Sequence, residues 1–148
     1  MTSRDDAEHE AGRQAERFKR VRDAHLTEMA EDYVELIADL IAQKGEARVV
    51  DLAGRLGVTK ATVNNTIQRL KRDGFVSSEP YRSIFLTKKG QGLAAASRER
   101  HQIVREFLIA LGVDAETADF DAEGIEHHVS DVTLDAFRSY LRKRRRAP

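Results

Sequence analysis

Apolar residues recur every three or four positions in a segment that ends at Lys44. This period is typical of an amphipathic helix that buries one face. Gly45 follows directly, and glycine often ends a helix because it accepts a left-handed backbone. The residues before this helix are polar, and we expect residues 1–23 to form a partly disordered extension. The buried stripe is expected to comprise Leu26, Met29, Ala30, Tyr33, Val34, Ile37, Leu40 and Ile41.

The next segment predicts two short helices joined by a tight turn. A helix over Val49–Leu56 is closed by Gly57, and Thr59 is placed to cap a second helix that runs to Asp73 and stops at Gly74. Two short helices with a glycine-containing turn make a helix-turn-helix. The second helix is expected to face inward with Val63, Ile67 and Leu70.

Two short segments after the helix-turn-helix predict strands, at Val76–Ser78 and Ile84–Leu86. The turn between them contains Glu79, Pro80, Tyr81 and Arg82. A hairpin in this position is a wing. Three helices are expected after it, over 88 to about 111 with Thr87 as its cap, about 115 to 128, and about 131 to 143.

This order of elements predicts a mainly α protein with an N-terminal winged helix-turn-helix domain and a C-terminal all-helical domain. We place the winged domain at residues 24–94 and the helical domain at residues 95–143. Residues 144–148 form a basic tail.

Composition narrows the functional classes. The 148-residue chain has 41% hydrophobic and 34% charged residues, which suits a packed core with a solvated surface. It has no cysteine, so disulfides and thiolate metal ligands are excluded and a reducing compartment is expected. Neither an apolar membrane span nor a signal peptide is apparent, and we expect a soluble, cytoplasmic protein without a membrane partner.

The net charge of zero hides a basic block followed by an acidic block. Cations outnumber acids between Glu46 and Asp73, whereas acids dominate from Arg98 to Asp135. This distribution suggests one surface for phosphates and another for cations.

The second helix of a helix-turn-helix places its N-terminal part against base edges in the major groove. Asparagine can pair with adenine there, and alanine can contact a thymine methyl group, whereas arginine and lysine suit phosphates. The alternative is a helix pair whose outer face is merely solvated. The predicted DNA-contacting residues are Thr59, Lys60, Ala61, Thr62, Asn64, Asn65, Gln68, Arg69, Arg72 and Arg82.

Carboxylates and histidines are spaced to share helix faces in three places. One pair lies at i, i+3 on the first helix, one histidine lies midway along the long helix, and a Glu-x-x-Glu-His motif follows. Four carboxylates and two imidazoles can hold two divalent ions, and oxygen-rich ligation without thiolates favours manganese over copper or zinc. The alternatives are a solvated acidic face and a hydrogen-bonded core histidine. The candidate ligands are Asp32, Glu35, His101, Glu123, Glu126 and His127.

On these residues the chain resembles the DtxR family of metal-dependent repressors, in particular its manganese transport regulators. The resemblance covers about Asp32 to Phe137. It is carried by AEDYVELIADLI, VVDLAGRLGVTKATVNNTIQRLKRDGFV, RERHQIVREFL and DAEGIEHHVSDVTLDAF. The last segment is the most specific of the four.

The resemblance implies a homodimer in which the helical domain supplies dimerisation and part of the metal site, while the winged helix binds palindromic double-stranded operator DNA. It assigns the six candidate ligands to two Mn²⁺ ions per subunit, with bridging carboxylates, and leaves His128 outside. The implied function is repression of manganese uptake genes, with no enzymatic activity and no organic cofactor. Fe²⁺ is the alternative metal, and Zn²⁺ is expected to bind in vitro.

Other functions remain open at this point. An iron(II)-responsive repressor of the same family is the nearest, although the sulfur ligands typical of that branch are missing from the ligand motifs. A di-metal carboxylate enzyme would use the same ligands but leave the helix-turn-helix without a role. A winged-helix regulator of an organic ligand would bind DNA regardless of chelators.

Overall fold

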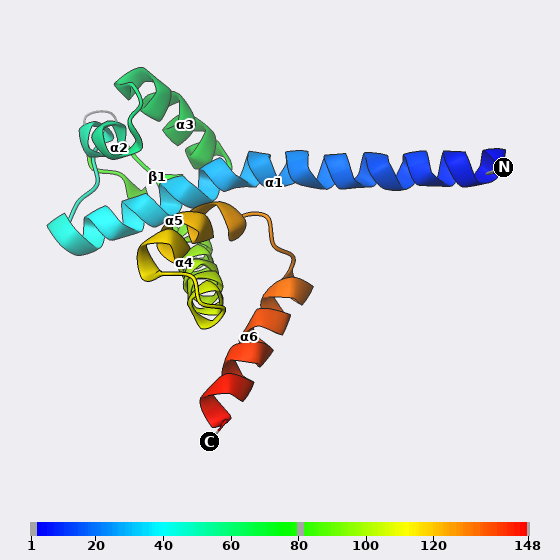
Figure 1. Cartoon of the computed structure of the whole chain (residues 1–148). Helices are drawn as coiled ribbons and strands as arrows, with labels where there is room; N and C mark the ends of the chain where they lie inside the picture. Colours follow the sequence, from blue (N-terminus) through cyan, green and yellow to red (C-terminus); the bar gives the residue numbers. More distant parts are fainter. Residues whose placement is uncertain (1–2, 80–81, 148) are drawn as a thin grey trace.

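Figure 1 shows a computed structural model that describes residues 3–79 and 82–147. The described residues form helices and one small hairpin, so the mainly α class with two domains is confirmed. The elements are α1 (Arg4–Lys44), α2 (Val49–Leu56), α3 (Lys60–Arg72), β1 (Val76–Ser77), β2 (Phe85–Leu86), α4 (Lys88–Ala110), α5 (Ala115–Ile125) and α6 (Asp131–Arg146). None of the described helices combines the length and apolar character needed to span a membrane. Parts of three predicted segments lie outside the described residues: 1–2 of the extension, Pro80 and Tyr81 of the turn, and Pro148 of the tail.

The first helix is longer than predicted. α1 runs as one helix from Arg4, so the predicted disorder is wrong for residues 4–23. Ser3 caps its first turn, and charged neighbours pair along its surface, as Arg13 and Glu10 do at 2.6 Å. Such pairs stabilise a solvated helix whose large apolar side chains, Phe18 and Val21, remain exposed. Figure 1 shows this N-terminal part of α1 projecting alone from the body of the molecule.

The winged domain shares one core between the middle of α1, the helix pair and the hairpin. α3 begins after Thr59, whose hydroxyl accepts the N–H of Thr62 at 3.1 Å, as the predicted cap should. Because one face of α3 is buried in this core, its opposite face is left open to solvent. The core includes Tyr33, Ile37, Leu40, Leu52, Val63, Ile67, Leu70, Val76 and Ile84.

The hairpin of the wing is shorter than predicted. β1 and β2 pair antiparallel, with Val76 opposite Leu86. Ile84 was expected to belong to the second strand, but it forms an isolated bridge with Ala47, in the loop after α1. Lys71 of α3 donates to the carbonyl of Ser78 at 2.8 Å, beyond the end of β1. The wing is therefore fastened to both α3 and the α1–α2 loop.

The helical domain packs α4 against α5 and α6. Its buried centre contains Val104, Ala122 and Leu134, and Phe107 of α4 stacks on Phe137 of α6 at 4.0 Å between ring centroids. α6 continues to Arg146, so most of the predicted basic tail is the last turn of a helix.

α5 ends earlier than predicted. Its last helical residue is Ile125 rather than His128, and Glu126 follows as a cap that keeps a helical backbone. Arg100 of α4 donates to the carbonyls of Glu126 and Val129, which fixes the turn after the helix. This turn carries the second half of the Glu-x-x-Glu-His motif.

The start of α4 passes so close to the residue before β1 that only glycine fits at Gly90. A Cβ atom there would lie 2.0 Å from the carbonyl oxygen of Phe75. Gly90→Ala is therefore expected to lower the free energy of unfolding by at least about 2 kcal/mol, because the backbone must shift.

Chemical denaturation followed by circular dichroism measures this effect. Gly92→Ala is the matched control, since a Cβ at Gly92 meets open space on the same helix. It should raise the free energy of unfolding by about 0.5–1 kcal/mol. Wild-type stability of Gly90→Ala would contradict the close approach.

Candidate metal centre and nucleic-acid interface

Candidate ligands from α1 and from the turn after α5 meet around His127, whose side chain is 1% exposed. Its Nε2 lies 3.0 Å from Oδ1 of Asp32 and 3.4 Å from Oε1 of Glu126. Its Nδ1 lies 2.6 Å from Oε2 of Glu31. Asp32 belongs to the helix that enters the winged-domain core, whereas His127 belongs to the helical domain. This first group of ligands therefore joins the two domains.

A second group lies where α4 meets the end of α5. Nδ1 of His101 is 3.3 Å from Oε1 of Glu123, and Nε2 of the same ring is 3.3 Å from Oδ1 of Asp119. One ligand atom from each of His101, Glu123 and Glu126 lies within 4.8 Å of the others. Because Glu126 also approaches His127, its carboxylate lies between the two groups.

Glu35 lies one helical turn beyond Asp32 and beside the second group. Burial raises the pKa of its carboxyl group, and the negative charges of Glu123 and Asp39 raise it further. The structure thus gathers five of the predicted ligands into the two groups, and it places Glu35 within their electrostatic reach.

The carboxyl group of Glu126 is buried without a hydrogen bond to the described residues. The residue is 1% exposed, and neither oxygen accepts a hydrogen bond from the described part of the chain. Burial raises its pKa to about 8, against the opposing charge of His127. Nδ1 of His101 is also buried without a hydrogen bond there. Such atoms are uncommon in native proteins, and a divalent cation would satisfy all three. Oxygen and imidazole donors suit manganese or iron, so the residues fit the ion that the resemblance implies.

Sequence reasoning missed the two carboxylates that hold the histidine rings. Glu31 binds Nδ1 of His127, and Asp119 binds Nε2 of His101 while also pairing with Arg105 at 2.7 Å. A carboxylate behind a ligating histidine fixes the orientation of the ring and increases its basicity. Asp119 could have been found, because it precedes Glu123 by one helical turn on α5. Glu31 offers only a weak signal, its place on the flank of the buried stripe.

The pairing of His127 also determines its charge. Burial acts to lower the pKa of this imidazole, but hydrogen bonds to Asp32 and Glu31 outweigh burial and raise the pKa to about 10. The protonated ring then supplies the one positive charge at the centre of the first group.

The predicted DNA-contacting residues lie on an open surface. All ten are exposed, and those on α3 face away from the core. Thr59 and Thr62 also serve the helix, because the Thr59 hydroxyl caps α3 and bonds to the Thr62 hydroxyl at 3.0 Å. Thr66, between them and the C-terminal cations of α3, is buried.

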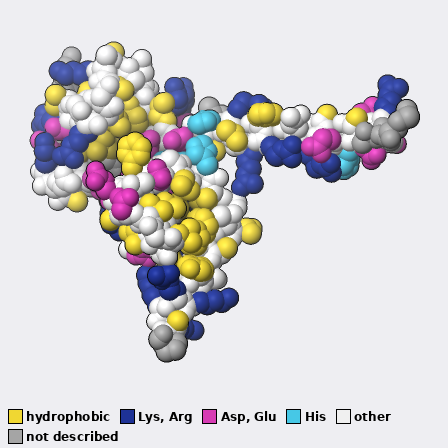
Figure 2. All heavy atoms as spheres, in the orientation of Figure 1, with side chains coloured by type: hydrophobic (Ala, Val, Ile, Leu, Met, Phe, Trp, Pro, Cys, Tyr) yellow, Lys and Arg dark blue, Asp and Glu magenta, His cyan; other side chains and the backbone are white. Residues whose placement is uncertain are grey.

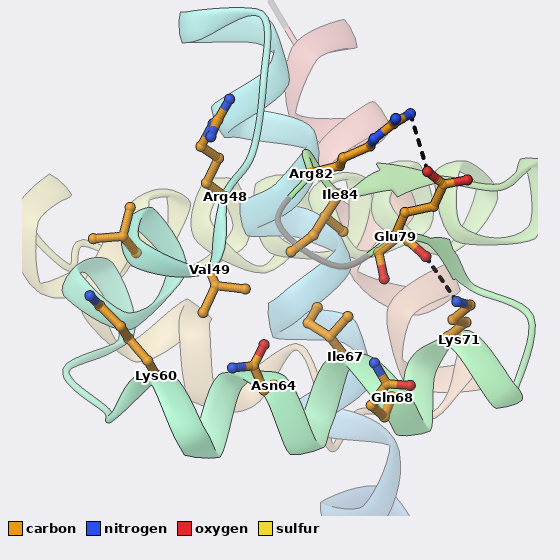
Figure 3. Close-up of a pocket in the computed structure, with 12 residues that line it drawn as sticks. Arg48, Val49, Lys60, Asn64, Ile67, Gln68, Lys71, Glu79, Arg82 and Ile84 are labelled. Carbon is orange, nitrogen blue, oxygen red and sulfur yellow. Dashed lines mark hydrogen bonds and ion pairs between the residues drawn. The ribbon is translucent and has the colours of Figure 1, made fainter.

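A groove of about 790 Å³ runs between α3, the start of α2 and the wing (Figure 3). Asn64 and Gln68 lie along its α3 side, and Arg82 lies on the wing side, where it pairs with Glu79 at 3.1 Å. Arg48 and Lys71, two cations of the type that suits phosphates, also line it. This arrangement of amides flanked by cations suits base edges and phosphates respectively.

Comparison with known proteins gives matches to two family models. Residues 25–84 match the model described as iron dependent repressor, N-terminal DNA binding domain. Residues 87–148 match iron dependent repressor, metal binding and dimerisation domain.

Curated relatives are named as regulators. The transcriptional regulator MntR of Escherichia coli O157:H7 is 56% identical over 128 residues, which is 86% of this chain and 83% of that protein. The HTH-type transcriptional regulator MntR of Bacillus subtilis (strain 168) is 41% identical over 109 residues, covering 74% of this chain and 77% of that one.

Solved structures give the same picture of the fold. The manganese-dependent transcriptional repressor in complex with manganese superposes with a TM-score of 0.67 at 30% identity, covering 76% of this chain. The chain spans about half of that longer structure, 52% of its length.

Removing the carboxylate behind His127 should weaken metal binding. Glu31→Ala is expected to lower the affinity for Mn²⁺ roughly 10–100-fold, because the imidazole loses the partner that orients it. Isothermal titration measures the change. Glu31→Gln keeps a hydrogen-bond acceptor and should lose less affinity for Mn²⁺ than Glu31→Ala does. Asp121→Ala, which removes an exposed carboxylate of α5, is the control. Wild-type affinity in Glu31→Ala would contradict the orienting role.

Proposed function

The chain belongs to the iron-dependent repressor family of transcriptional regulators, and we propose that it is a manganese-responsive repressor. In this proposal a metal-loaded homodimer binds a palindromic operator in the cytoplasm and controls manganese uptake genes. The observation that carries it is the position of Glu126, where candidate ligands of the DNA-binding and helical domains meet around a buried carboxylate that accepts no hydrogen bond from the described residues.

Two Mn²⁺ ions per subunit fit the arrangement of the ligands. Asp32 and His127 would hold one ion, and His101 and Glu123 would hold the other, with Glu35 nearby and Glu126 as the bridge. The bound ions would supply positive charge that neutralises the clustered carboxylates. Oxygen-rich ligation and the similarity to a manganese-dependent transcriptional repressor support manganese. Fe²⁺ is the alternative, and Zn²⁺ is expected to bind in vitro.

The residues of the chain suggest how metal could control DNA binding. Without an ion, the carboxylates of α1 and α5 repel one another across the junction between the domains. When that repulsion is removed, α1 stays fixed against the turn after α5, and the winged domain keeps one orientation. The two recognition helices of a dimer can then lie about 34–36 Å apart, one turn of DNA. Metal would thus shift the population toward the domain arrangement that binds it more tightly, by an amount set by the difference in metal affinity between the two arrangements.

Operator binding should require the metal. A duplex selected from a random pool by the Mn²⁺-loaded protein should bind in a gel shift, and binding should be lost after chelation. Titrating Mn²⁺, Fe²⁺ and Zn²⁺ separately identifies the activating ion. Glu123→Ala should abolish the response while its circular dichroism spectrum stays unchanged, because Glu123 is exposed and its loss leaves no cavity. Equal affinity with Mn²⁺ and with chelator would disprove the metal switch.

Base-contacting and phosphate-contacting residues of α3 should behave differently. Asn65→Ala is expected to reduce the free energy of binding to the selected duplex by about 1–3 kcal/mol and to change binding to random DNA little. Arg72→Ala, at the other end of the same exposed face, should weaken both and reduce the salt dependence of binding. Fluorescence anisotropy at several salt concentrations measures each. A uniform loss in Asn65→Ala would instead assign that residue to phosphate contact.

A further inference from the structure

A group of histidine side chains lies on the surface where the projecting part of α1 leaves the body (Figure 2). His25 of α1 and His128 of the turn after α5 meet edge to face, with ring centroids 5.0 Å apart. Oε2 of Glu28 lies 3.2 Å from Nδ1 of His25 and 3.3 Å from Nε2 of His128. Neither histidine belongs to the proposed manganese centre.

We propose that His25, Glu28 and His128 form a further divalent-metal site, one that prefers Zn²⁺. One ligand atom from each of the three side chains lies within 4.8 Å of the others. Zn²⁺ binds imidazole nitrogen and carboxylate oxygen at about 2.0–2.2 Å, so small rotations of these partly exposed side chains close the site. An ion replaces the shared contacts of the Glu28 carboxylate with bonds to all three residues.

The donor set separates this site from the proposed manganese centre. Two imidazoles and one carboxylate contain a larger share of nitrogen donors than the ligands of the proposed manganese centre. Nitrogen ligands favour Zn²⁺ over Mn²⁺. Three protein ligands with an open fourth position are also common for Zn²⁺. Zn²⁺ at this site therefore does not require the manganese centre to be filled.

The position gives the site a consequence for the fold. Glu28 also lies within 4.8 Å of ligand atoms of Asp32 and His127, so the two metal regions are adjacent. An ion at the surface site fastens α1 to the turn after α5, at the point where α1 loses its other contacts with the body. Zinc is therefore expected to stiffen the same junction that the manganese centre spans.

Metal counting tests the proposal directly. Purified chain is dialysed to equilibrium at fixed free Zn²⁺, and bound metal is measured by elemental analysis. His25→Ala and His128→Ala should each bind about one Zn²⁺ fewer per chain than wild type, since two ligands alone hold the ion weakly. His9→Ala, a histidine farther along the projecting helix, should bind as wild type does. An unchanged count in His25→Ala and His128→Ala, or an equal loss in His9→Ala, overturns the site.

A second measurement locates the ion without relying on the count. The chain has five histidines, so ring nitrogen signals can be assigned by single substitutions. Zn²⁺ should shift the signals of His25 and His128 together, and shifts confined to His101 and His127 overturn the proposal. Glu123→Ala distinguishes the two hypotheses, because it removes a ligand of the manganese centre alone. A metal count insensitive to Glu123→Ala contradicts that centre and leaves the surface site standing.

Discussion

The carboxyl group of Glu126 is held away from water at the junction of α1, α4 and α5, and neither of its oxygens is hydrogen-bonded within the described residues. The His127 ring lies 3.4 Å from Oε1, but its charge does not offset the cost of burying this carboxylate, so the group favours a bound proton or cation. The domains meet at this point, and their coupling is therefore tied to what neutralises Glu126. A regulator that must respond to a small ion benefits from placing a carboxylate that is costly to bury in its charged form at such a junction.

The protein moderates this cost with groups that also orient the candidate ligands. His127, held between Glu31 and Asp32, brings positive charge to the first group while burial acts against it. Asp119 fixes the ring of His101 from the outer side and is itself held by Arg105. Each histidine thus has a carboxylate behind it and acidic side chains in front. The rings are already oriented, so less side-chain freedom is lost when a cation binds.

Local signals in the sequence predicted much of this arrangement. Glycines at 45, 57, 74 and 112 stand at the predicted helix ends, and all have positive φ. The recognition helix was predicted from its caps, and the candidate ligands from their spacing together with the family resemblance. The orientation of His127 could not be predicted in this way, because Glu31 lies 96 positions away in sequence. Residues 4–23 were misjudged because the segment is mostly polar and its large apolar side chains, Phe18 and Val21, stay exposed. The helix is supported instead by charge pairs along its own surface.

The early end of α5 sets the backbone around the second half of the acidic motif. The sequence predicted that α5 continues to His128. Instead the chain turns after Ile125, and Arg100 takes the carbonyls of Glu126 and Val129. The end of a helix carries negative partial charge, which here adds to the carboxylates of Glu123 and Glu126. Arg100 offsets part of the charge of the backbone, and the side chains of Glu123 and Glu126 remain to attract a cation. Positively charged side chains lie instead on the outer face of α3 and on the wing, where phosphates would bind.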